Sequence, residues 1–166
     1  MLTSDAIIIS KGAFRMTEEE FYIFCHENRD LRIERDANQN IIIMSPTKRK
    51  TGRFNAAIIA QLYNWSEKFE NGYVYDSSTA FRLNNNAVRS PDAAWIAKEN
   101  LRKDESDDTK EFEEGAPDFV IELKSKSDTV KGLQLKMEEY IANGVKLGYL
   151  IIPELEKVYI YEPGKE

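Results

Sequence analysis

Two charged residues, Glu122 and Lys124, stand at a stretch that is predicted to be a buried strand. The segment Phe119–Leu123 reads FVIEL, and Lys124 follows it directly. Side chains two residues apart on a strand point to the same face, so the carboxylate and the amine would lie side by side. Charged groups are costly to bury without a partner, and the pair therefore indicates either an ion pair or a chemical site. The E-x-K spacing alone is a weak signal, because it occurs by chance in many proteins.

A metal site would need a second acid near Glu122, and Asp92 is the better of two candidates. Asp118 lies four residues before Glu122, roughly 13 Å along a strand, which is too far for both carboxylates to bind one ion. Asp92 follows Pro91 and precedes the apolar run Ala93–Ala97, which predicts a second strand. Neighbouring strands lie ~4.8 Å apart, so the carboxylates of Asp92 and Glu122 could converge on one cation. Such a pair suits Mg²⁺, which keeps several waters and takes only one or two carboxylates.

Three further residues are candidates for the same site, each with a structural alternative. Glu34 alternates with apolar residues in a predicted strand, where it could equally be an exposed charge. Lys124 could orient or deprotonate a water, or neutralise charge on a phosphate, but it could also simply pair with Glu122. Gln134 lies one turn into the next predicted helix and could reach the mouth of the site. Its structural alternative is a solvent-facing position.

Four cations, Lys48, Arg49, Lys50 and Arg53, stand together at the predicted start of a long helix. A helix N-terminus with basic side chains can bind phosphate groups. A solvated helix start in a charged protein is the alternative. The net charge is −6 over 166 residues, so no global basic field favours nucleic-acid binding, which counts against a high-affinity DNA binder but not against a local basic groove.

The composition is that of an ordinary soluble globular protein, and residues 1–166 are predicted to form one domain. The one cysteine, Cys25, excludes an internal disulfide and indicates a reducing, cytoplasmic location. With one histidine and one cysteine, the chain disfavours a structural zinc site and a Ser-His-Asp triad. We expect no signal peptide and no membrane-spanning helix.

The pattern of elements predicts an α/β (α+β) domain with a mixed sheet flanked by helices. Thr17 with Glu20 forms a capping-box signature for a first helix, and the sequence from about Lys48 to Phe69 is amphipathic and is capped by Ser45-Pro46-Thr47. A third helix is predicted at Val130–Asn143, and Glu99–Glu114 is predicted to be an exposed loop. The predicted strands are Ala6–Ser10, Leu31–Arg35, Ile41–Met44, Tyr73–Tyr75, Thr79–Leu83, Ala93–Ala97, Phe119–Leu123, Lys146–Ile152 and Lys157–Tyr161.

Pro91-Asp92, followed about thirty residues later by Glu122-Leu123-Lys124, resembles the motif of the PD-(D/E)xK nuclease superfamily. Most of the chain, roughly residues 15–163, is similar to the Uma2 family (DUF820) of restriction-endonuclease-like proteins. The matching stretches are MTEEEFYIF, LRIERDANQNIIIMSPT, SPDAAWIAK, PDFVIELKSKSD, KMEEYIANGVKLGYLII and VYIYEP. The order of SPD and PDFVIELKSKSD is the most specific of these features.

The resemblance implies a restriction-endonuclease-like core with a divalent-metal nuclease site that acts on DNA. By matching positions, Asp92 and Glu122 would bind Mg²⁺ or Mn²⁺, Lys124 would be the catalytic lysine, and Glu34 would be a further acid at the site. Many Uma2 members have another residue in place of the lysine, for example in an E-V-x-S pattern, whereas this chain keeps E-x-K. The products would carry a 5′-phosphate and a 3′-hydroxyl.

Three other functions are consistent with the sequence. The first is a non-catalytic metal-binding or regulatory module on the same fold, which the net negative charge favours. The second is a hydrolase of phosphate esters that acts on nucleotides rather than polymers. The third is a structural subunit of a homodimer, with aromatic side chains such as Tyr159 and Tyr161 of the last predicted strand at the interface.

Overall fold

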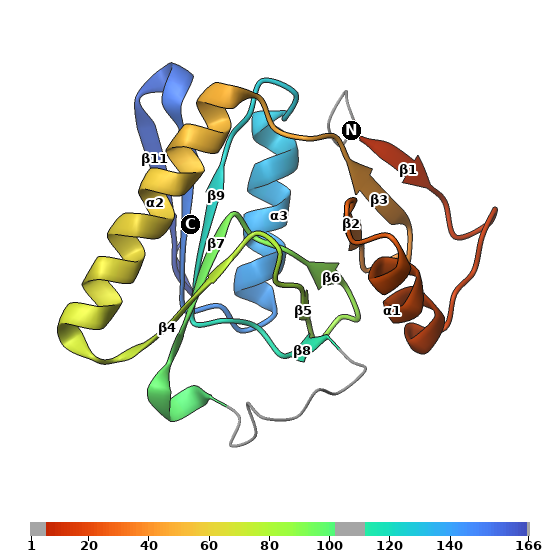
Figure 1. The fold of residues 1–166 in the computed structure, drawn as a ribbon, viewed down its shortest axis with the longest axis horizontal. Helices are drawn as coiled ribbons and strands as arrows, with labels where there is room; N and C mark the ends of the chain where they lie inside the picture. The colour runs from red at the N-terminus through yellow and green to blue at the C-terminus, as the bar shows by residue number, and fades with distance from the viewer. Residues whose placement is uncertain (1–5, 102–111, 166) are drawn as a thin grey trace.

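The computed structural model describes residues 6–101 and 112–165, which form three α-helices and two β-sheets (Figure 1). The helices are α1 (Glu18–Glu27), α2 (Arg49–Phe69) and α3 (Val130–Ala142). The first sheet has the order β1-β3-β2-β6-β5-β8, with β1 (Ile7–Ile9), β2 (Arg32–Arg35), β3 (Ile41–Met44), β5 (Phe81–Arg82), β6 (Val88–Arg89) and β8 (Glu113–Glu114). The second has the order β11-β10-β9-β7-β4, with β4 (Gly72–Asp76), β7 (Ala93–Ala97), β9 (Phe119–Leu123), β10 (Leu147–Ile152) and β11 (Lys157–Tyr161).

Strand β9 is the middle strand of the second sheet and is covered on both faces, as its apolar sequence predicts. It pairs in parallel with β10 and antiparallel with β7. Val120 belongs to the core that also contains Met137 and Tyr140 of α3, whereas Ile121 packs with Leu62 of α2. Figure 1 shows β9 between these two helices. The strand therefore delivers the side chain of Glu122 to a face that is already closed to water.

The first sheet packs against α1. The predicted capping box is present, because Thr17 Oγ1 accepts a hydrogen bond from the amide of Glu20 and the Glu20 carboxylate accepts one from the amide of Thr17. Phe21 of α1 is fully buried in a cluster with Ile33, Ile41 and Val88. The strands predicted at Leu31–Arg35 and Ile41–Met44 are present as β2 and β3 and pair as an antiparallel hairpin, with Ile33 opposite Ile43. This small core holds β2, and with it Glu34, against the rest of the molecule.

Helix α2 is amphipathic and spans nearly the residues predicted for it, but its N-terminal cap differs from the expected one. Its N-cap residue is Lys48, which makes no side-chain capping hydrogen bond, so the Ser45-Pro46-Thr47 segment precedes the helix without capping it. The last helical residue is Phe69, as predicted, and the C-cap residue Glu70 adopts the left-handed conformation. In the described part of the chain, none of the helices is long and apolar enough to cross a bilayer.

The α/β (α+β) class is confirmed, but the strands form two sheets rather than one. The segment Glu99–Glu114 was predicted to be a loop; its C-terminal end instead forms β8, which pairs in parallel with β5, while a 3₁₀ turn spans Lys98–Asn100. A pairing between strands this far apart leaves no local pattern in such a charged segment, which is why the sequence did not indicate it. Positions 102–111 of the predicted loop lie outside the described residues.

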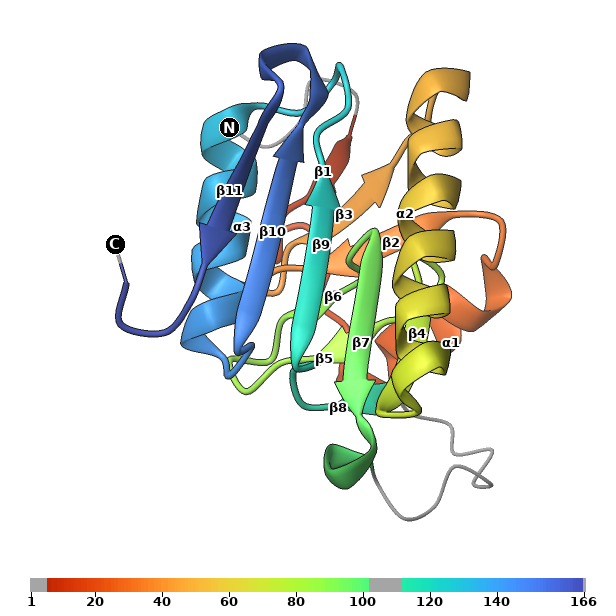
Figure 2. The same cartoon turned by 90° about the vertical axis from the view of Figure 1, so that its left-hand side faces the viewer.

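The two tyrosines of the last strand, β11, were expected to be exposed at an interface, but they face the core of the molecule. Tyr159 and Tyr161 pack against the core on the α3 side of the sheet, so they do not offer a free aromatic surface. Val158 and Ile160 lie opposite Ile151 and Tyr149, on the face that carries α2, and are 51% and 61% exposed. Helix α2 contacts β4 and β7, and in Figure 2 the strands β10 and β11 lie in front with no helix over them.

Candidate active site

A cavity of about 420 Å³ lies between the start of α2, the end of β9 and the start of α3. Four of the five residues predicted to be catalytic line it, namely Glu34, Asp92, Glu122 and Lys124. Lys48, Arg49 and Lys50 of the predicted phosphate-binding patch also line it, whereas Gln134 and Arg53 do not. The fold therefore gathers side chains from five elements or their ends around one opening.

Asp92 and Glu122 come from neighbouring strands. Ala93 is opposite Ile121 in the antiparallel pairing of β7 with β9, so the same register places Asp92 opposite Glu122. Directly opposite residues share a face of the sheet, with Cβ atoms about 4.5–5.5 Å apart. The Oδ2 atom of Asp92 accepts a hydrogen bond from the amide of Leu123 at 2.9 Å, which ties the carboxylate to β9. Its Oδ1 atom lies 3.1 Å from Nη1 of Arg32.

Glu34 reaches the site from β2 and is fully enclosed by donors. Its Oε1 atom accepts hydrogen bonds from the amide of Ser90 at 3.1 Å and from Nζ of Lys136 at 2.8 Å. Its Oε2 atom is 3.1 Å from Nη1 of Arg89. Burial by itself raises the pKa of Glu34, but the charges of Lys136 and Arg89 outweigh burial and lower that pKa to about 2. This acid is therefore a permanent anion of the site.

Lys136 of α3 is the lysine whose amine touches the acids, and the sequence analysis did not single it out. Its Nζ atom lies 2.8 Å from both Glu34 Oε1 and Glu122 Oε1. A usable signal was present, because Lys136 stands three residues after Leu133 and four before Tyr140, two apolar residues that are buried in the structure. A lysine on the buried stripe of a helix needs a buried acid, and this one has two.

Glu122 is the acid whose ionisation is least favourable. Burial raises its pKa, the neighbouring carboxylates of Asp92 and Glu34 raise it further, and Lys136 opposes them, leaving the pKa at about 7. The hydroxyl of Tyr140 donates a hydrogen bond to Glu122 Oε1 at 3.0 Å. Burial also raises the pKa of Tyr140 well above its ordinary value, so this hydroxyl stays a donor. The site can therefore gain or lose one proton near neutral pH.

Lys124 lines the cavity but does not form the ion pair with Glu122 that was one of its two interpretations. Its Nζ atom donates a hydrogen bond to the carbonyl of Ser125 at 2.9 Å and lies 4.0 Å from Glu154 Oε1. Its backbone amide bonds to Ile151, so the pairing of β9 with β10 continues past Leu123. The amine thus sits at the edge of the cavity, and its catalytic role stays a prediction.

Gln134 and Asp118, which the sequence analysis also considered, are not among the residues that line the cavity. Gln134 is rotated by about 200° from Lys136 around the helix, which explains why it is not among the lining residues and does not reach the mouth as expected. Asp118 accepts hydrogen bonds from the amide of Ala97 and the side chain of Asn100. It therefore anchors the start of β9, as its distance from Glu122 along the strand indicated.

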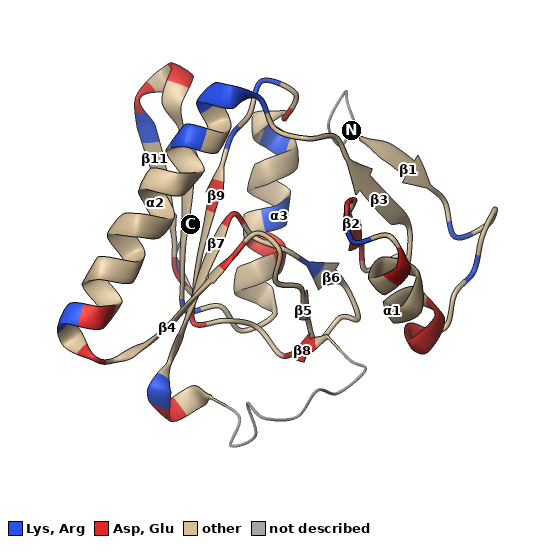
Figure 3. Cartoon of the chain, in the orientation of Figure 1, with Lys and Arg blue, Asp and Glu red and all other residues tan. Residues whose placement is uncertain are grey.

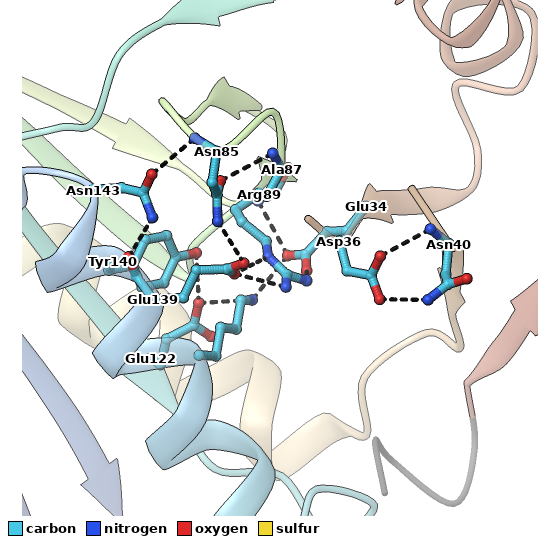
Figure 4. A network of polar contacts seen from close by, with 12 residues as sticks. Glu34, Asp36, Asn40, Asn85, Ala87, Arg89, Glu122, Glu139, Tyr140 and Asn143 are labelled. Atoms are coloured by element: carbon cyan, nitrogen blue, oxygen red, sulfur yellow. Dashed lines mark hydrogen bonds and ion pairs between the residues drawn. The ribbon is translucent and has the colours of Figure 1, made fainter. Parts of the chain in front are cut away.

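A network of buried polar contacts continues from Glu34 away from the cavity (Figure 4). Arg89 bonds to Glu34 on one side and, through Nε and Nη2 at 2.7 Å, to Glu139 Oε2 on the other. Glu139 Oε1 accepts a hydrogen bond from Asn85 at 3.0 Å. Positive and negative groups alternate along this chain of contacts, so each buried charge has a partner of opposite sign.

Oxygen donors suit a hard divalent cation such as Mg²⁺ or Mn²⁺. Asp92 and Glu122 supply carboxylate oxygens on one face of the sheet. These carboxylates and that of Glu34 repel one another, and a bound cation would reduce this repulsion. No group of three or more acidic, histidine or cysteine side chains that could hold a metal occurs among the residues that the structure describes. A cation at this place would therefore rest on the two carboxylates and on other oxygen ligands.

Lys48, Arg49 and Lys50 form a basic rim at the cavity entrance, which Figure 3 shows as blue segments at the start of α2. The first turn of α2 contains no acidic residue, and no side chain caps it. Its free amide groups and the macrodipole therefore add to the positive field of the rim. Arg53 lies over the ring of Phe54, with 5.5 Å between the guanidinium carbon and the ring centroid.

Residues 18–166 match the model of the Uma2 family, whose description is "Putative restriction endonuclease". None of the curated proteins matches the chain. Among solved structures, the fold is similar to that of a crystal structure described as "a putative nuclease belonging to DUF820 from Anabaena variabilis ATCC 29413". The two are 18% identical, with a TM-score of 0.69 over 81% of this chain and 73% of the other.

Proposed function

The chain belongs to the Uma2 family, and from this premise we propose that it is a divalent-metal-dependent endonuclease that hydrolyses phosphodiester bonds in DNA. One observation carries the proposal: Asp92 and Glu122 converge from neighbouring strands, with the amine of Lys136 at 2.8 Å from Glu122, in a cavity with a basic rim. Acids paired with an amine behind an anion-binding entrance suit phosphoryl-ester chemistry.

Asp92 and Glu122 would hold Mg²⁺ or Mn²⁺. When bound, the cation would polarise the scissile phosphodiester and lower the pKa of a coordinated water. Glu34 fixes the amine of Lys136 beside Glu122, so the positive charge is in place before substrate arrives. Lys124, at the cavity edge, would neutralise the charge that develops on the phosphate oxygens.

The basic rim would position the DNA backbone over the acids. Lysine and arginine contacts to phosphates carry no base information, so the rim supports binding without sequence preference. The proposed substrate is therefore DNA in general. The negative charge of the rest of the molecule would keep the contact local to the cavity.

A second candidate is the non-catalytic metal-binding or regulatory module. It is favoured by one specific observation, which is that the acids of the site already have internal cations. Asp92 contacts Arg32, Glu34 contacts Arg89, and both Glu34 and Glu122 contact Lys136. Such a network would be equally suited to a site that holds its structure without turnover.

Cleavage of supercoiled DNA separates the two candidates. We expect cleavage that needs added Mg²⁺ or Mn²⁺, and a loss of about 100-fold or more in Asp92→Ala and Lys124→Ala. Lys157→Ala, at an exposed position of β11 away from the cavity, is the matched control and should cut like the wild type. Tight magnesium binding without any cleavage would favour the module. Wild-type cleavage by Lys124→Ala would remove Lys124 from the mechanism.

We also propose that the protein forms a homodimer. The support is the uncovered apolar face of β10 and β11 with Val158 and Ile160, and not the two tyrosines expected from the sequence. Exposed apolar surface of this kind is typical of protein interfaces.

The cytoplasmic location, expected from the single cysteine, and the single domain over residues 1–166 stay predictions.

A further inference from the structure

One wall of the cavity is apolar, although the reaction proposed above uses only charged and polar groups. This apolar wall consists of Ile42, Met44, Pro46, Phe54, Leu123 and Pro153. In the pairing of β2 with β3, Ile42 is opposite Glu34, and Met44 is two residues further along the strand. Directly opposite residues, and residues two apart on a strand, share a face of the sheet. The apolar wall and the acid Glu34 therefore face the same space.

The apolar wall stands apart from the hydrophobic clusters of the protein. Its members other than the two prolines belong to none of the three clusters that the described residues form. Ile41, the neighbour of Ile42, packs instead on the other face of the first sheet with Phe21 of α1. Ligand pockets are lined mainly by apolar and aromatic side chains with a few polar groups. The wall therefore favours a substrate that brings an apolar surface as well as a phosphate.

Phe54 is the aromatic residue among the described side chains that line the cavity. Its ring is half-buried and lies beside two cations, with 5.6 Å from Lys50 Nζ and 5.5 Å from Arg53 Cζ to the ring centroid. In proteins that bind single strands, bases stack on aromatic side chains while nearby cations follow the backbone. Phe54 and its two cations supply both kinds of contact at the cavity.

The acids lie too deep for a double helix to reach them. Glu34, Asp92 and Glu122 are 2%, 7% and 3% exposed. Their cavity of about 420 Å³ lies within the range of roughly 300–1,000 Å³ that is typical of small-molecule sites. A duplex is stiff, with a persistence length of about 150 base pairs, and keeps the faces of its bases stacked. A single strand bends easily and can present a phosphate together with the bare face of a base.

We propose that the substrate is unpaired DNA. A nucleotide of a single strand would enter the cavity with its base stacked on Phe54 and packed against Ile42 and Met44. Its phosphate would then reach Asp92 and Glu122. The inference rests on the proposed function, because this phosphate is the one to be cut. Fully paired DNA would bind at the basic rim without entering, since extruding a base costs the energy of unpairing and unstacking it.

Cleavage of circular DNA of one sequence in three forms tests the inference, because circles have no ends that fray. The forms are a single-stranded circle, a relaxed double-stranded circle, and a relaxed circle that carries a bubble of mismatched bases. With Mg²⁺ or Mn²⁺, we expect the first and third to be cut at least about 10-fold faster than the second, with the cuts inside the bubble. Negatively supercoiled DNA should be cut faster than relaxed DNA, because supercoiling favours strand separation.

Substitutions of Phe54 test the stacking surface. Phe54→Ala should lower kcat/KM for the single-stranded circle by at least about 10-fold, and Phe54→Trp should keep most of the activity because it retains an aromatic face. Tyr63→Ala is the matched control, since Tyr63 is an exposed aromatic residue of the same helix that does not line the cavity, and it should cut like the wild type. Thermal unfolding should show that all variants are folded.

A second readout is independent of turnover. A single-stranded oligonucleotide that carries 5-iodouracil is mixed with the protein in the presence of a chelator and irradiated. We expect a crosslink to Phe54, located by mass spectrometry, and none when the same base is paired in a duplex. Tyr63 should not be crosslinked in either case.

The two readouts separate this inference from the proposed function. Equal cleavage of the single-stranded and the relaxed paired circles, or wild-type cleavage by Phe54→Ala, would overturn the inference and leave the proposed function standing. A wild type that cuts none of these DNAs would overturn the proposed function. In that case a crosslink at Phe54 would still support binding of an unpaired base, and its absence would overturn the inference as well.

Discussion

Glu122 makes the stability of the protein depend on pH near neutrality. Its pKa of about 7 in the folded protein lies above the ordinary glutamate value of about 4.3. Between these values the folded state binds more protons than the unfolded state, so the free energy of unfolding contributed by this group falls as pH rises. Below the ordinary glutamate pKa, the contribution of Glu122 to the free energy of unfolding does not change with pH. Above about pH 7 this contribution has been lost. Glu34, with a pKa of about 2, acts in the opposite sense and only in acid.

We therefore predict that Glu122→Gln removes a decline in stability between about pH 5 and about pH 8. Urea unfolding at both pH values gives the free energy of unfolding of the wild type and of the variant. The difference between the two proteins should be larger at the higher pH. An identical pH profile in both would show that Glu122 ionises in the folded protein as it does in water.

Lys136 is predicted to matter for folding as well as for the site, because it is the shared partner of two buried acids. Replacing it by methionine keeps the packing volume but leaves Glu34 and Glu122 without its charge, and removing one partner of a buried pair costs on the order of 3–5 kcal/mol. The loss should be smaller in mild acid, because Glu122 can then be neutral. Chemical unfolding of Lys136→Met measures it.

Lys131→Met provides the comparison for this variant. It removes the same charge from the same helix at an exposed position, and should change stability by less than about 0.5 kcal/mol. Equal effects of the two substitutions would mean that Lys136 contributes no more than a surface lysine.

At the scale of the element, helix α2 joins the two parts of the proposed activity. Its first turn carries the basic rim, and its inward face packs Leu62 against the second sheet while Asn55 contacts Asp92. The lack of a capping side chain at Lys48 leaves the first amide groups of the helix available to an anion. One rigid element thus sets the distance between the phosphate-binding entrance and the acids.

We predict that Lys48→Glu/Lys50→Glu weakens DNA binding by roughly 10-fold or more in low salt and lowers the salt dependence of the remaining binding, because fewer counterions are released from the DNA. Fluorescence anisotropy with labelled duplex DNA at several salt concentrations measures both quantities. Lys68→Glu/Lys157→Glu changes the net charge equally at positions away from the cavity. The rim would be excluded as the binding surface if both double variants weakened binding alike.

At the scale of the whole molecule, the described residues leave an apolar surface on β10 and β11 without a helix over it. It includes Val158 and Ile160 of β11 beside the half-buried side chains of Tyr149 and Ile151, and α2 reaches only the β4 and β7 side of the same sheet (Figure 2). Symmetric pairing of two copies through one self-complementary patch is the commonest way to cover such a surface.

We predict a dimer in solution that Val158→Glu/Ile160→Glu converts to a monomer, because the interface would have to bury four unpaired carboxylates. Light scattering coupled to gel filtration gives the mass of each. Lys157→Glu, on the same strand but without loss of apolar surface, should stay dimeric. A monomeric wild type at high protein concentration would contradict the prediction.

The sequence by itself determined the local structure and the pair of acids. The capping box at Thr17, the β2–β3 hairpin and the apolar strand Phe119–Leu123 depend on neighbouring residues, so their patterns are visible in the chain. The motifs around Asp92 and Glu122 were equally local, and they indicated the family that the comparison then showed.

Only the tertiary structure decided which amine meets those acids. Lys124 is close to Glu122 in sequence but turns toward Ser125, whereas Lys136 comes from the next helix and contacts Glu34 and Glu122 together. The parallel pairing of β8 with β5 was hidden for the same reason. Backbone geometry fixes which residues share a face, but contacts between distant segments depend on how whole elements pack, and short-range sequence patterns do not record that packing.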